Sequence, residues 1–405
     1  MRMTPYSEAP AQAATARRPV PDPFEQRLDY TRWCRRAYGA FAGTPDAGLL
    51  FDSTICEPTE RLFQVLRSHS AGAIADRYES VFSHGNRFVA RAIADRYDID
   101  DRQILCTTGA TNAVSMVMRT RLRDGGHVVI EHPSFDLLPY IATEAGAEVS
   151  YLPRRGPGFQ PDPAELRTLL RPHTRVVLVS NLHNPSGTAL DGARLRALAA
   201  EADSVGAILL VDEVYADFAR DLYGGCAATL APNIVSANSL SKVHGLFALR
   251  CGWVVADPQT VDHISEVNAQ NEFGVSKLTH AVASFLLEDA QELDAHWRSV
   301  LASNRPIIER HASTLIAAGL IAGDVPEYGC MYFPELRGVN NTWAFASWLW
   351  RTHRLLVAPG ELFGARGHIR LGYGGDAEAL TMGLERLGAA ISEFSMKSTS
   401  KGARA

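Results

Sequence analysis

Lysine is the rarest charged residue in this chain, with only four copies among 405 residues. Lysine and arginine together number 40 against 45 for aspartate and glutamate, which gives a formal net charge of -5, and no long basic run occurs. Proteins that bind nucleic acids neutralise phosphates with clustered lysine and arginine side chains. The composition therefore argues against a nucleic-acid partner. The lysines are Lys242, Lys277, Lys397 and Lys401.

Long apolar runs and paired ligand spacings are also missing. No stretch approaches about 18 consecutive apolar residues, so no membrane-spanning helix is expected. Residues 1–21 lack the apolar core of a signal peptide. The 6 cysteines lie far apart and the 13 histidines include no His-Glu-x-x-His pattern, so neither a disulfide framework nor a metal site is expected. These absences predict a cytoplasmic protein.

Short apolar, β-branched runs alternate with helical stretches through the middle of the chain. Strands buried on both faces and joined by helices are typical of a mostly parallel sheet. We therefore predict the α/β class, with helices on both faces of the sheet. The strands are predicted at residues 127–130, 147–152, 175–179, 207–211, 233–237 and 252–256.

The pattern of predicted secondary structure changes after about residue 276, where long helices are followed by short strands and a final helix. This change predicts a second, smaller α+β domain. We divide the chain into a flexible N-terminal arm (1–22), a small domain (23–59 and 291–395), a large α/β domain (60–290) and a polar tail (396–405). Helices are predicted at 24–41, 277–287, 291–318 and 377–394, and strands at 330–334, 355–358 and 368–372.

Polar side chains follow three successive strands of the predicted sheet. Asn184 precedes Asp212 by 28 residues, and Asp212 precedes Lys242 by 30, which is one strand-helix unit each time. The carboxyl ends of such strands meet at one edge, where ligands bind. Taken singly, each group fits a turn or a helix cap. Together they predict a site at this edge.

The chemistry of pyridoxal phosphate explains this set. The cofactor ring accepts electrons best when its pyridine nitrogen is protonated, and Asp212 can hold that proton. Asn184 and Tyr215 are suitable partners for the ring hydroxyl. A lysine that attacks an aldehyde must be neutral, which requires burial or nearby cations. Lys242 is the best candidate among the lysines.

The phosphate of such a cofactor needs hydroxyls, a cation and backbone N–H groups at a helix start. Ser239, Ser241 and Arg250 supply the hydroxyls and the cation. The small residues Gly109-Ala110-Thr111 precede a helical stretch, so the backbone there can approach an anion. Thr111 adds a third hydroxyl.

These motifs stand in the order of a known family. The chain resembles the class I/II aminotransferases of the aspartate-aminotransferase fold, fold type I, over roughly residues 50–395. The resemblance implies pyridoxal phosphate in Schiff-base linkage to Lys242 and a homodimer with active sites at the subunit interface. The motifs are Gly109-Ala110-Thr111, Asn184-Pro185-Ser186-Gly187, Asp212-x-x-Tyr215, Ser239-x-Ser241-Lys242 with Arg250-x-Gly252, and Arg370.

The resemblance also implies individual roles. Lys242 would carry the proton at the substrate α-carbon, and Arg370 would grip the substrate α-carboxylate with its planar fork. Asp212 would pair with the pyridine nitrogen. Asn184 and Tyr215 would contact the ring oxygen, with Asn184 also near the substrate. Lys242, Asp212 and Tyr215 are thus the expected catalytic residues.

Two aromatic residues and one departure complete the comparison with the family. Phe135 resembles the aromatic residue that stacks on the cofactor ring, and Tyr78 resembles the tyrosine that reaches the neighbouring subunit's phosphate. Cys56 stands where many relatives have a glycine beside the substrate carboxylate, which would reshape that wall of the pocket. Scaffold or surface roles are expected for His132, His183 and His244.

The function predicted from these residues is an aminotransferase that moves an amino group from an α-amino acid to a 2-oxo acid by a ping-pong route. Another fold type I enzyme acting on an amino acid, such as a lyase, decarboxylase, cyclase or oxidase, is an alternative with the same motifs. A non-catalytic sensor that binds the cofactor is a remote alternative. No second arginine motif marks a side-chain carboxylate site, and the substrate stays open.

Overall fold

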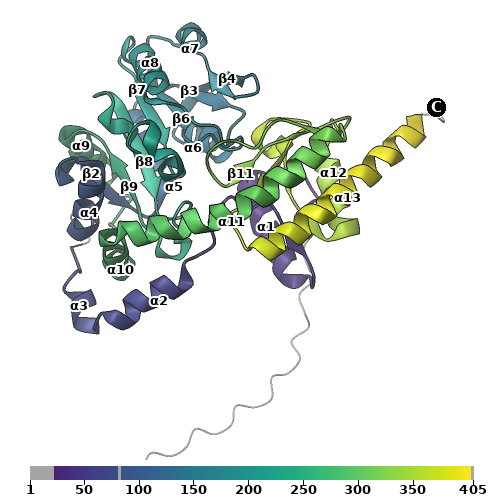
Figure 1. Ribbon diagram of the computed structural model, residues 1–405. Coiled ribbons are helices and arrows are strands. Elements are labelled where there is room, and N and C mark those ends of the chain that lie inside the picture. The colour runs from purple at the N-terminus through teal and green to yellow at the C-terminus, as the bar shows by residue number, and fades with distance from the viewer. Residues whose placement is uncertain (1–21, 81–83, 403–405) are drawn as a thin grey trace, which may run out of the picture.

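Two groups of strands organise the chain, and long helices pack beside them (Figure 1). The computed structural model describes residues 22–80 and 84–402, with side chains described as far as residue 396. Most of the predicted N-terminal arm, residues 1–21, lies outside the described residues. Of the arm, Asp22 is described, and its carboxylate pairs with Arg351 at 2.9 Å.

The larger group is an eight-stranded sheet in the order β2-β9-β8-β7-β6-β3-β4-β5. Neighbours from β8 through β7, β6 and β3 to β4 pair in parallel, whereas β9 is antiparallel to both its neighbours and β5 is antiparallel to β4. The prediction of a mostly parallel sheet is confirmed. The strands are β2 (Ile104–Thr107), β3 (Gly126–His132), β4 (Ala147–Arg155), β5 (Gln160–Pro161), β6 (Thr174–Ser180), β7 (Ile208–Asp212), β8 (Ile234–Ser239) and β9 (Gly252–Val255).

Helices cover both faces of this sheet because successive side chains of its central strands point to opposite sides. Val176 and Leu178 of β6 share a core with α5 (Ala110–Arg121), α6 (Leu137–Glu144) and α9 (Pro258–Asn268). Val177 and Val179 share a different core with α7 (Pro163–Leu169) and α8 (Gly192–Asp203). All four valine and leucine side chains are fully buried, as the continuous apolar run predicts.

A third core lies at the β2 and β9 side of the sheet. There Trp253 and Val255 pack with α4 (Arg87–Tyr97) and α10 (Lys277–Glu288). Two further helices, α2 (Thr59–Ser68) and α3 (Ala71–Ala75), contact α10. Short 3-10 helices are η1 (Asp101–Gln103), η2 (Ala216–Leu222), η3 (Ala227–Thr229), η4 (Phe247–Leu249) and η5 (Gly360–Phe363).

The second group of strands is small and packs with the N-terminal and C-terminal helices around one core. Its helices are α1 (Tyr30–Gly43), α11 (Ala290–Ala317), α12 (Thr342–His353) and α13 (Ala377–Gly402). Its strands form three small sheets: β1 (Gly48–Leu49) with β13 (Leu355–Leu356), β10 (Ile321–Ala322) with β12 (Glu335–Leu336), and β11 (Met331–Tyr332) with β15 (Ile369–Gly372) and β14 (Ala358–Pro359). Figure 1 shows α11 running from the helices beside the large sheet to this second group.

Two predicted helix boundaries were wrong. The first helix begins at Tyr30 rather than residue 24, because the Asp29 side chain caps it by accepting a hydrogen bond of 2.8 Å from the backbone N–H of Arg32. The last helix continues to Gly402 instead of ending near residue 394. The tail lacks apolar periodicity, and nothing from Ser395 to Lys401 breaks a helix.

None of the helices in the described ranges combines the length and apolar character that crossing a lipid bilayer requires.

Candidate active site

Lys242 lies in the loop that follows strand β8, under a segment from the N-terminal part of the chain. Its Nζ donates a hydrogen bond of 3.1 Å to Thr54 Oγ1, and its carbonyl oxygen accepts one of 3.1 Å from the Ile55 N–H. Gly245 in the same loop has φ +68, and a Cβ there would lie 2.6 Å from the Ile55 oxygen. The loop and the segment around Thr54 are therefore in close contact.

Asp212 ends strand β7 beside the lysine loop and is partly buried. Its pKa is raised to about 7, mainly by burial and to a lesser extent by the charge of Glu131, while the N–H of Val214 and the charge of Lys242 oppose the shift. A carboxylate with so high a pKa lacks a strong cationic partner. A protonated ring nitrogen would be such a partner.

Tyr215 and Asn184 occupy the ends of neighbouring strands at the same edge of the sheet. The buried Tyr215 hydroxyl lies 2.8 Å from Ser53 Oγ, and burial raises the pKa of its phenol while the charge of Arg370 lowers it. The phenol is therefore protonated near neutral pH and can donate a hydrogen bond. Asn184 Oδ1 accepts a hydrogen bond of 2.8 Å from Arg370 Nη1, so its amide N–H₂ remains to serve a ligand.

Arg370 on strand β15 is almost fully buried, with an exposed fraction of 1%. Its Nη2 donates to the Tyr30 hydroxyl at 2.6 Å and to the Phe51 carbonyl at 2.9 Å, and its Nη1 donates to Asn184. The rings of Tyr30 and Phe363 flank the guanidinium at 5.1 and 4.9 Å. Neutral groups hold this buried cation, and no carboxylate in residues 22–80 or 84–396 forms an ion pair with it. A substrate carboxylate would supply the missing charge.

An anion cradle lies where helix α5 begins. Gly109 precedes the helix with φ +102, and no side chain caps the helix start. Arg250 Nη2 donates to the Thr108 carbonyl at 2.9 Å, and a Cβ on Gly109 would lie 2.6 Å from that nitrogen. The Ser241 hydroxyl is buried without a partner in the described structure, beside Ser239, whose Oγ accepts from the Ser241 N–H at 3.3 Å. Uncapped N–H groups, an arginine and an unpaired hydroxyl fit a phosphate.

The remaining predicted site residues lie at varied distances from this centre. Ala110 is buried as the first residue of α5, whereas Thr111 is exposed. Phe135 follows β3, and its ring lies edge-on to Tyr30 with 5.0 Å between centroids. Tyr78 is 41% exposed after α3, and no hydrogen bond of the described residues joins it to the cradle. Its expected reach into a partner subunit stays a prediction.

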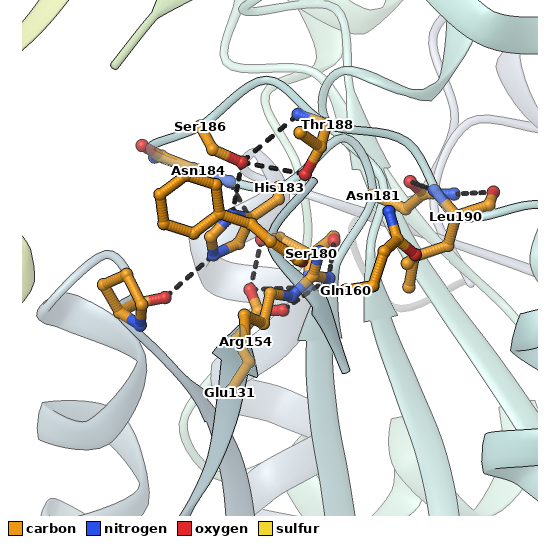
Figure 2. Close-up of polar contacts among 12 residues, drawn as sticks. Glu131, Arg154, Gln160, Ser180, Asn181, His183, Asn184, Ser186, Thr188 and Leu190 are labelled. Carbon is orange, nitrogen blue, oxygen red and sulfur yellow. Dashed lines mark hydrogen bonds and ion pairs between the residues drawn. The ribbon is translucent and has the colours of Figure 1, made fainter. Parts of the chain in front are cut away.

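A buried ion pair beneath the strand ends positions Asn184 (Figure 2). The side chains of Glu131 and Arg154 are fully buried and lie 2.7 Å apart. Ser180 donates its N–H to Glu131 at 2.8 Å and its hydroxyl to the same carboxylate oxygen. The Ser180 Oγ in turn accepts a hydrogen bond of 3.1 Å from the Asn184 N–H. Sequence reasoning did not predict that Glu131 and Arg154 form an ion pair.

His183 fastens the loop that carries Asn184. One ring nitrogen lies 2.6 Å from Ser186 Oγ and the other 2.8 Å from the Pro133 carbonyl oxygen. Figure 2 shows the contact between His183 and Ser186. Burial lowers the pKa of His183 well below its ordinary value, so the ring is neutral. Because the Pro133 carbonyl can only accept, Nε2 donates to it and Nδ1 accepts from the Ser186 hydroxyl. This is a scaffold role, as expected for this histidine.

His244 holds the loop that carries Lys242 by contacting a carboxylate outside that loop. Its Nε2 lies 3.3 Å from the Asp217 carboxylate, which Arg96 also contacts at 2.9 Å. Burial alone raises the pKa of Asp217, but the His244 hydrogen bond and the charge of Arg96 outweigh it and hold the pKa well below the ordinary range. The ionised carboxylate therefore ties the loop to helix α4.

Sequence reasoning missed the contribution of helix α1 and of residues 51–54. Tyr30 uses its hydroxyl for Arg370 and its backbone N–H for Asp136 Oδ2, at 2.7 Å. The pKa of Asp136 is raised to about 6, mainly by burial and also by the charge of Asp29, while the Tyr30 N–H opposes the shift. Cys56 was singled out in this region, and its exposed side chain lies two residues beyond Thr54. Cys56 was therefore the one residue by which the sequence indicated that this segment lies near the substrate.

Comparison with known proteins places this chain in a family. Residues 50–387 match the family described as aminotransferase class I and II. Capreomycidine synthase of Streptomyces vinaceus is 30% identical over 314 residues, covering 77% of this chain and 79% of that protein. Arginine–pyruvate transaminase of Pseudomonas aeruginosa is 29% identical over 324 residues, covering 76% of this chain and 81% of that protein.

Solved structures show the same fold. A PLP-dependent cyclase, OrfR, superposes with a TM-score of 0.78 and 28% identity, covering 94% of this chain and all of that chain. A PLP-dependent aminotransferase from Streptococcus suis 89-1591 has a TM-score of 0.78 and 26% identity, covering 85% of this chain and 93% of that chain. The similar proteins thus include both transaminases and cyclases.

Proposed function

The chain belongs to the class I and II aminotransferases, which depend on pyridoxal phosphate, and we propose that it transfers the amino group of an α-amino acid to a 2-oxo acid by a ping-pong route. One observation carries the proposal: an amine, a carboxylate and a buried guanidinium from three separate elements lie near one another, since the amine acts electrostatically on the carboxylate and both cations act on Tyr30. These groups are Lys242 after β8, Asp212 on β7 and Arg370 on β15.

The residues of the site fit the cofactor. When bound, pyridoxal phosphate supplies an electron sink conjugated to the amino group of the substrate. Asp212 would hold the proton on its ring nitrogen, because burial raises the pKa of the carboxylate and a ring cation beside it would favour its charged form. Tyr215 and Asn184 would bind its ring oxygen, and Phe135 would lie against the ring. Its phosphate would lie among Gly109, Ala110, Thr111, Ser239, Ser241 and Arg250, with the partner's Tyr78 completing the proposed set.

The side chains of this protein would divide the work of transamination. Arg370 would orient the substrate by binding its α-carboxylate, helped by Asn184. Lys242 would remove and return the proton at the α-carbon, with Thr54 holding Nζ in place at 3.1 Å. Burial of Arg370 and Tyr215 keeps water from the groups around the reacting carbon.

Cyclisation of an amino acid is the second candidate. It is favoured by the similarity to capreomycidine synthase and to the cyclase OrfR, which extends over 94% of this chain. The resemblance matches Cys56, in the segment beside Lys242, to a glycine of many relatives, and a side chain at that position would reshape the pocket wall. Both reactions need Lys242, Asp212 and Arg370, and they differ in the step after the α-proton is lost.

An anaerobic screen of amino acids tests the two candidates. The purified holoenzyme receives single L-amino acids, and the 2-oxo product, the pyridoxamine form of the cofactor and any cyclised product are measured. L-Arginine belongs in the screen because one relative is named for it. Stoichiometric 2-oxo acid and pyridoxamine support transamination. A cyclised product without pyridoxamine would instead support the second candidate. Carbon dioxide release would favour a decarboxylase, and oxygen uptake in a parallel aerobic run would favour an oxidase.

Borohydride reduction tests the assignment of the lysine. Reduction of the holoenzyme followed by peptide mapping is expected to find the cofactor on Lys242. Modification of Lys277 instead would overturn the site. Retention of cofactor without turnover of any amino acid would favour the sensor alternative.

The proposal also covers assembly and location. A homodimer with active sites at its interface would follow the pattern that the resemblance implies, and a cytoplasmic location would follow from the composition of the chain. Sedimentation of the holoenzyme checks the assembly, and a monomer with full activity would contradict it.

A further inference from the structure

Residues 51–54 pass along the site, and three of the four contact its principal groups. Asp52 stands between these contacts and is itself partly buried. Its charge contributes to raising the pKa of Tyr215, so the carboxylate lies near the groups of the site. The contacts are Phe51 O to Arg370 Nη2 at 2.9 Å, Ser53 Oγ to the Tyr215 hydroxyl at 2.8 Å, and Thr54 Oγ1 to Lys242 Nζ at 3.1 Å.

One face of helix α1 lies opposite this segment. Tyr30, Cys34 and Tyr38 recur at intervals of four residues and therefore share that face. Tyr30 holds Arg370 at one end, and the Tyr38 hydroxyl donates a hydrogen bond of 2.7 Å to Asp52 Oδ2 at the other. The face thus runs from the carboxylate-binding arginine to Asp52.

The charge of Asp52 reaches into the pocket. Burial raises the pKa of the Cys34 thiol, the charges of Lys242 and Arg370 lower it, and the charge of Asp52 raises it. At the buried Cys330, burial is again the main cause of a raised pKa, and Asp52 is the next. One carboxylate therefore acts on the same groups as the two cations of the site.

Asp52 has no cationic partner among the described residues. Tyr38 is its one hydrogen-bond donor there, and no arginine, lysine or histidine side chain of those ranges forms an ion pair with it. A partly buried carboxylate loses part of its hydration, and a matched cation with hydrogen-bond donors compensates that loss. The rest of this chain, as far as the structure describes it, supplies neither at this position.

We propose that Asp52, held by Tyr38, binds the cationic end of the substrate side chain, so that the substrate is a basic α-amino acid carrying a guanidinium or ammonium group. This inference rests on the proposed function, which places the substrate α-carboxylate on Arg370 and its amino group at Lys242. The substrate carboxylate would then lie near Phe51, which contacts Arg370, and the amino group near Thr54, which contacts Lys242. From there the substrate side chain would extend along the face of α1 toward Asp52.

The test compares two amino acids of nearly equal shape that differ in charge. Calorimetric titration of the holoenzyme with L-arginine and with L-citrulline gives two dissociation constants, and steady-state assays with both give the two KM values. The wild-type protein is expected to bind L-arginine at least about tenfold more tightly, which is a typical effect of a charge-assisted hydrogen bond. Asp52→Asn is expected to bring the ratio close to one while binding of L-citrulline stays unchanged.

Three further variants separate the role of Asp52 from general damage. Asp52→Glu keeps the charge and is expected to keep most of the preference. Tyr38→Phe removes the hydrogen bond that orients the carboxylate and is expected to reduce the preference partly. Asp46→Asn removes one exposed negative charge six residues earlier, where the native backbone has φ +57, which asparagine tolerates, and it is expected to keep the full preference.

The outcomes distinguish this inference from the function it rests on. Equal binding of L-arginine and L-citrulline by the wild-type protein, or a preference that survives in Asp52→Asn, overturns the role of Asp52 and leaves amino-acid turnover intact. Failure of every α-amino acid, cationic or neutral, to bind or react overturns the proposed function as well.

Discussion

Arg370 Nη1 donates a hydrogen bond of 2.8 Å to Asn184 Oδ1, so the side chain expected to bind the substrate carboxylate is tied to one expected to contact the cofactor ring. The two residues come from different groups of strands, β15 and the end of β6. Binding at one end of the pocket therefore depends on the geometry at the other.

Replacing Asn184 with alanine tests this link. The variant loses a hydrogen bond to a charged group, worth about 1.5–3 kcal/mol, and kcat/KM is expected to fall roughly 10- to 100-fold. The KM for the amino acid is expected to rise because Arg370 loses its orientation. Steady-state kinetics measure both, with the exposed Asn340→Ala as the matched control. An unchanged KM would show that Asn184 serves the cofactor alone.

Replacing Asp212 with asparagine tests the origin of the raised pKa. The pKa of about 7 lies above the ordinary aspartate value. Because the pKa of Asp212 is higher in the folded than in the unfolded state, its ionisation lowers the free energy of unfolding. This loss is absent below about pH 4, grows as the pH rises and is complete above about pH 7, where it amounts to no more than roughly 4 kcal/mol. The cofactor-free variant is therefore expected to unfold at higher temperature than the wild type at about pH 8, and at a similar temperature at about pH 4.

Thermal melts across this pH range check the expectation for Asp212. Asp203→Asn, an exposed change of the same kind, serves as the control and is expected to show no such trend. Turnover of the loaded Asp212→Asn enzyme should fall sharply, since an amide cannot stabilise a proton on the cofactor ring. A stabilising effect that is the same at every pH would contradict the pKa assignment.

Replacing Glu131 with glutamine tests the buried ion pair. The change leaves Arg154 buried without an opposite charge, and such losses cost about 3–5 kcal/mol. Urea unfolding is expected to show this decrease in the free energy of unfolding. Glu165→Gln breaks the exposed pair with Arg155 and should change stability little. Similar stabilities for the two variants would mean that the buried pair contributes nothing specific.

Replacing Gly109 with alanine tests the anion cradle. The added Cβ would lie 2.6 Å from Arg250 Nη2 at a φ of +102, so cofactor retention is expected to drop by at least about tenfold. Gly146→Ala is a matched control, because its φ is also positive, +82, but nothing lies within 4 Å of the new Cβ. Dialysis against cofactor-free buffer and absorbance of the retained cofactor give the comparison. Equal retention in the two variants would remove Gly109 from the cradle.

The strand ends were readable from the sequence because local pattern determines them. Buried runs set the strands of the large sheet, and the polar residues after β6, β7 and β8 follow within a few positions. The contacts of Tyr30 and Phe51 with Arg370 were not readable, since they join residues 340 and 319 positions apart. Periodicity carries no information about such distant partners. The Glu131–Arg154 pair was missed for a similar reason, because burial of a charge leaves no mark in the sequence around it.

Damage to the start of helix α1 is expected to affect the binding of substrate and the binding of cofactor differently. Tyr30 joins Arg370 through its hydroxyl and Asp136 through its backbone N–H, but it does not touch the cradle around Gly109. Fraying of this helix end would therefore weaken the affinity for amino acids and leave the coloured, cofactor-loaded protein intact. A preparation whose absorbance spectrum shows full cofactor occupancy can therefore still have lost its affinity for the amino-acid substrate. Whether it has done so depends on the integrity of residues near the N-terminus.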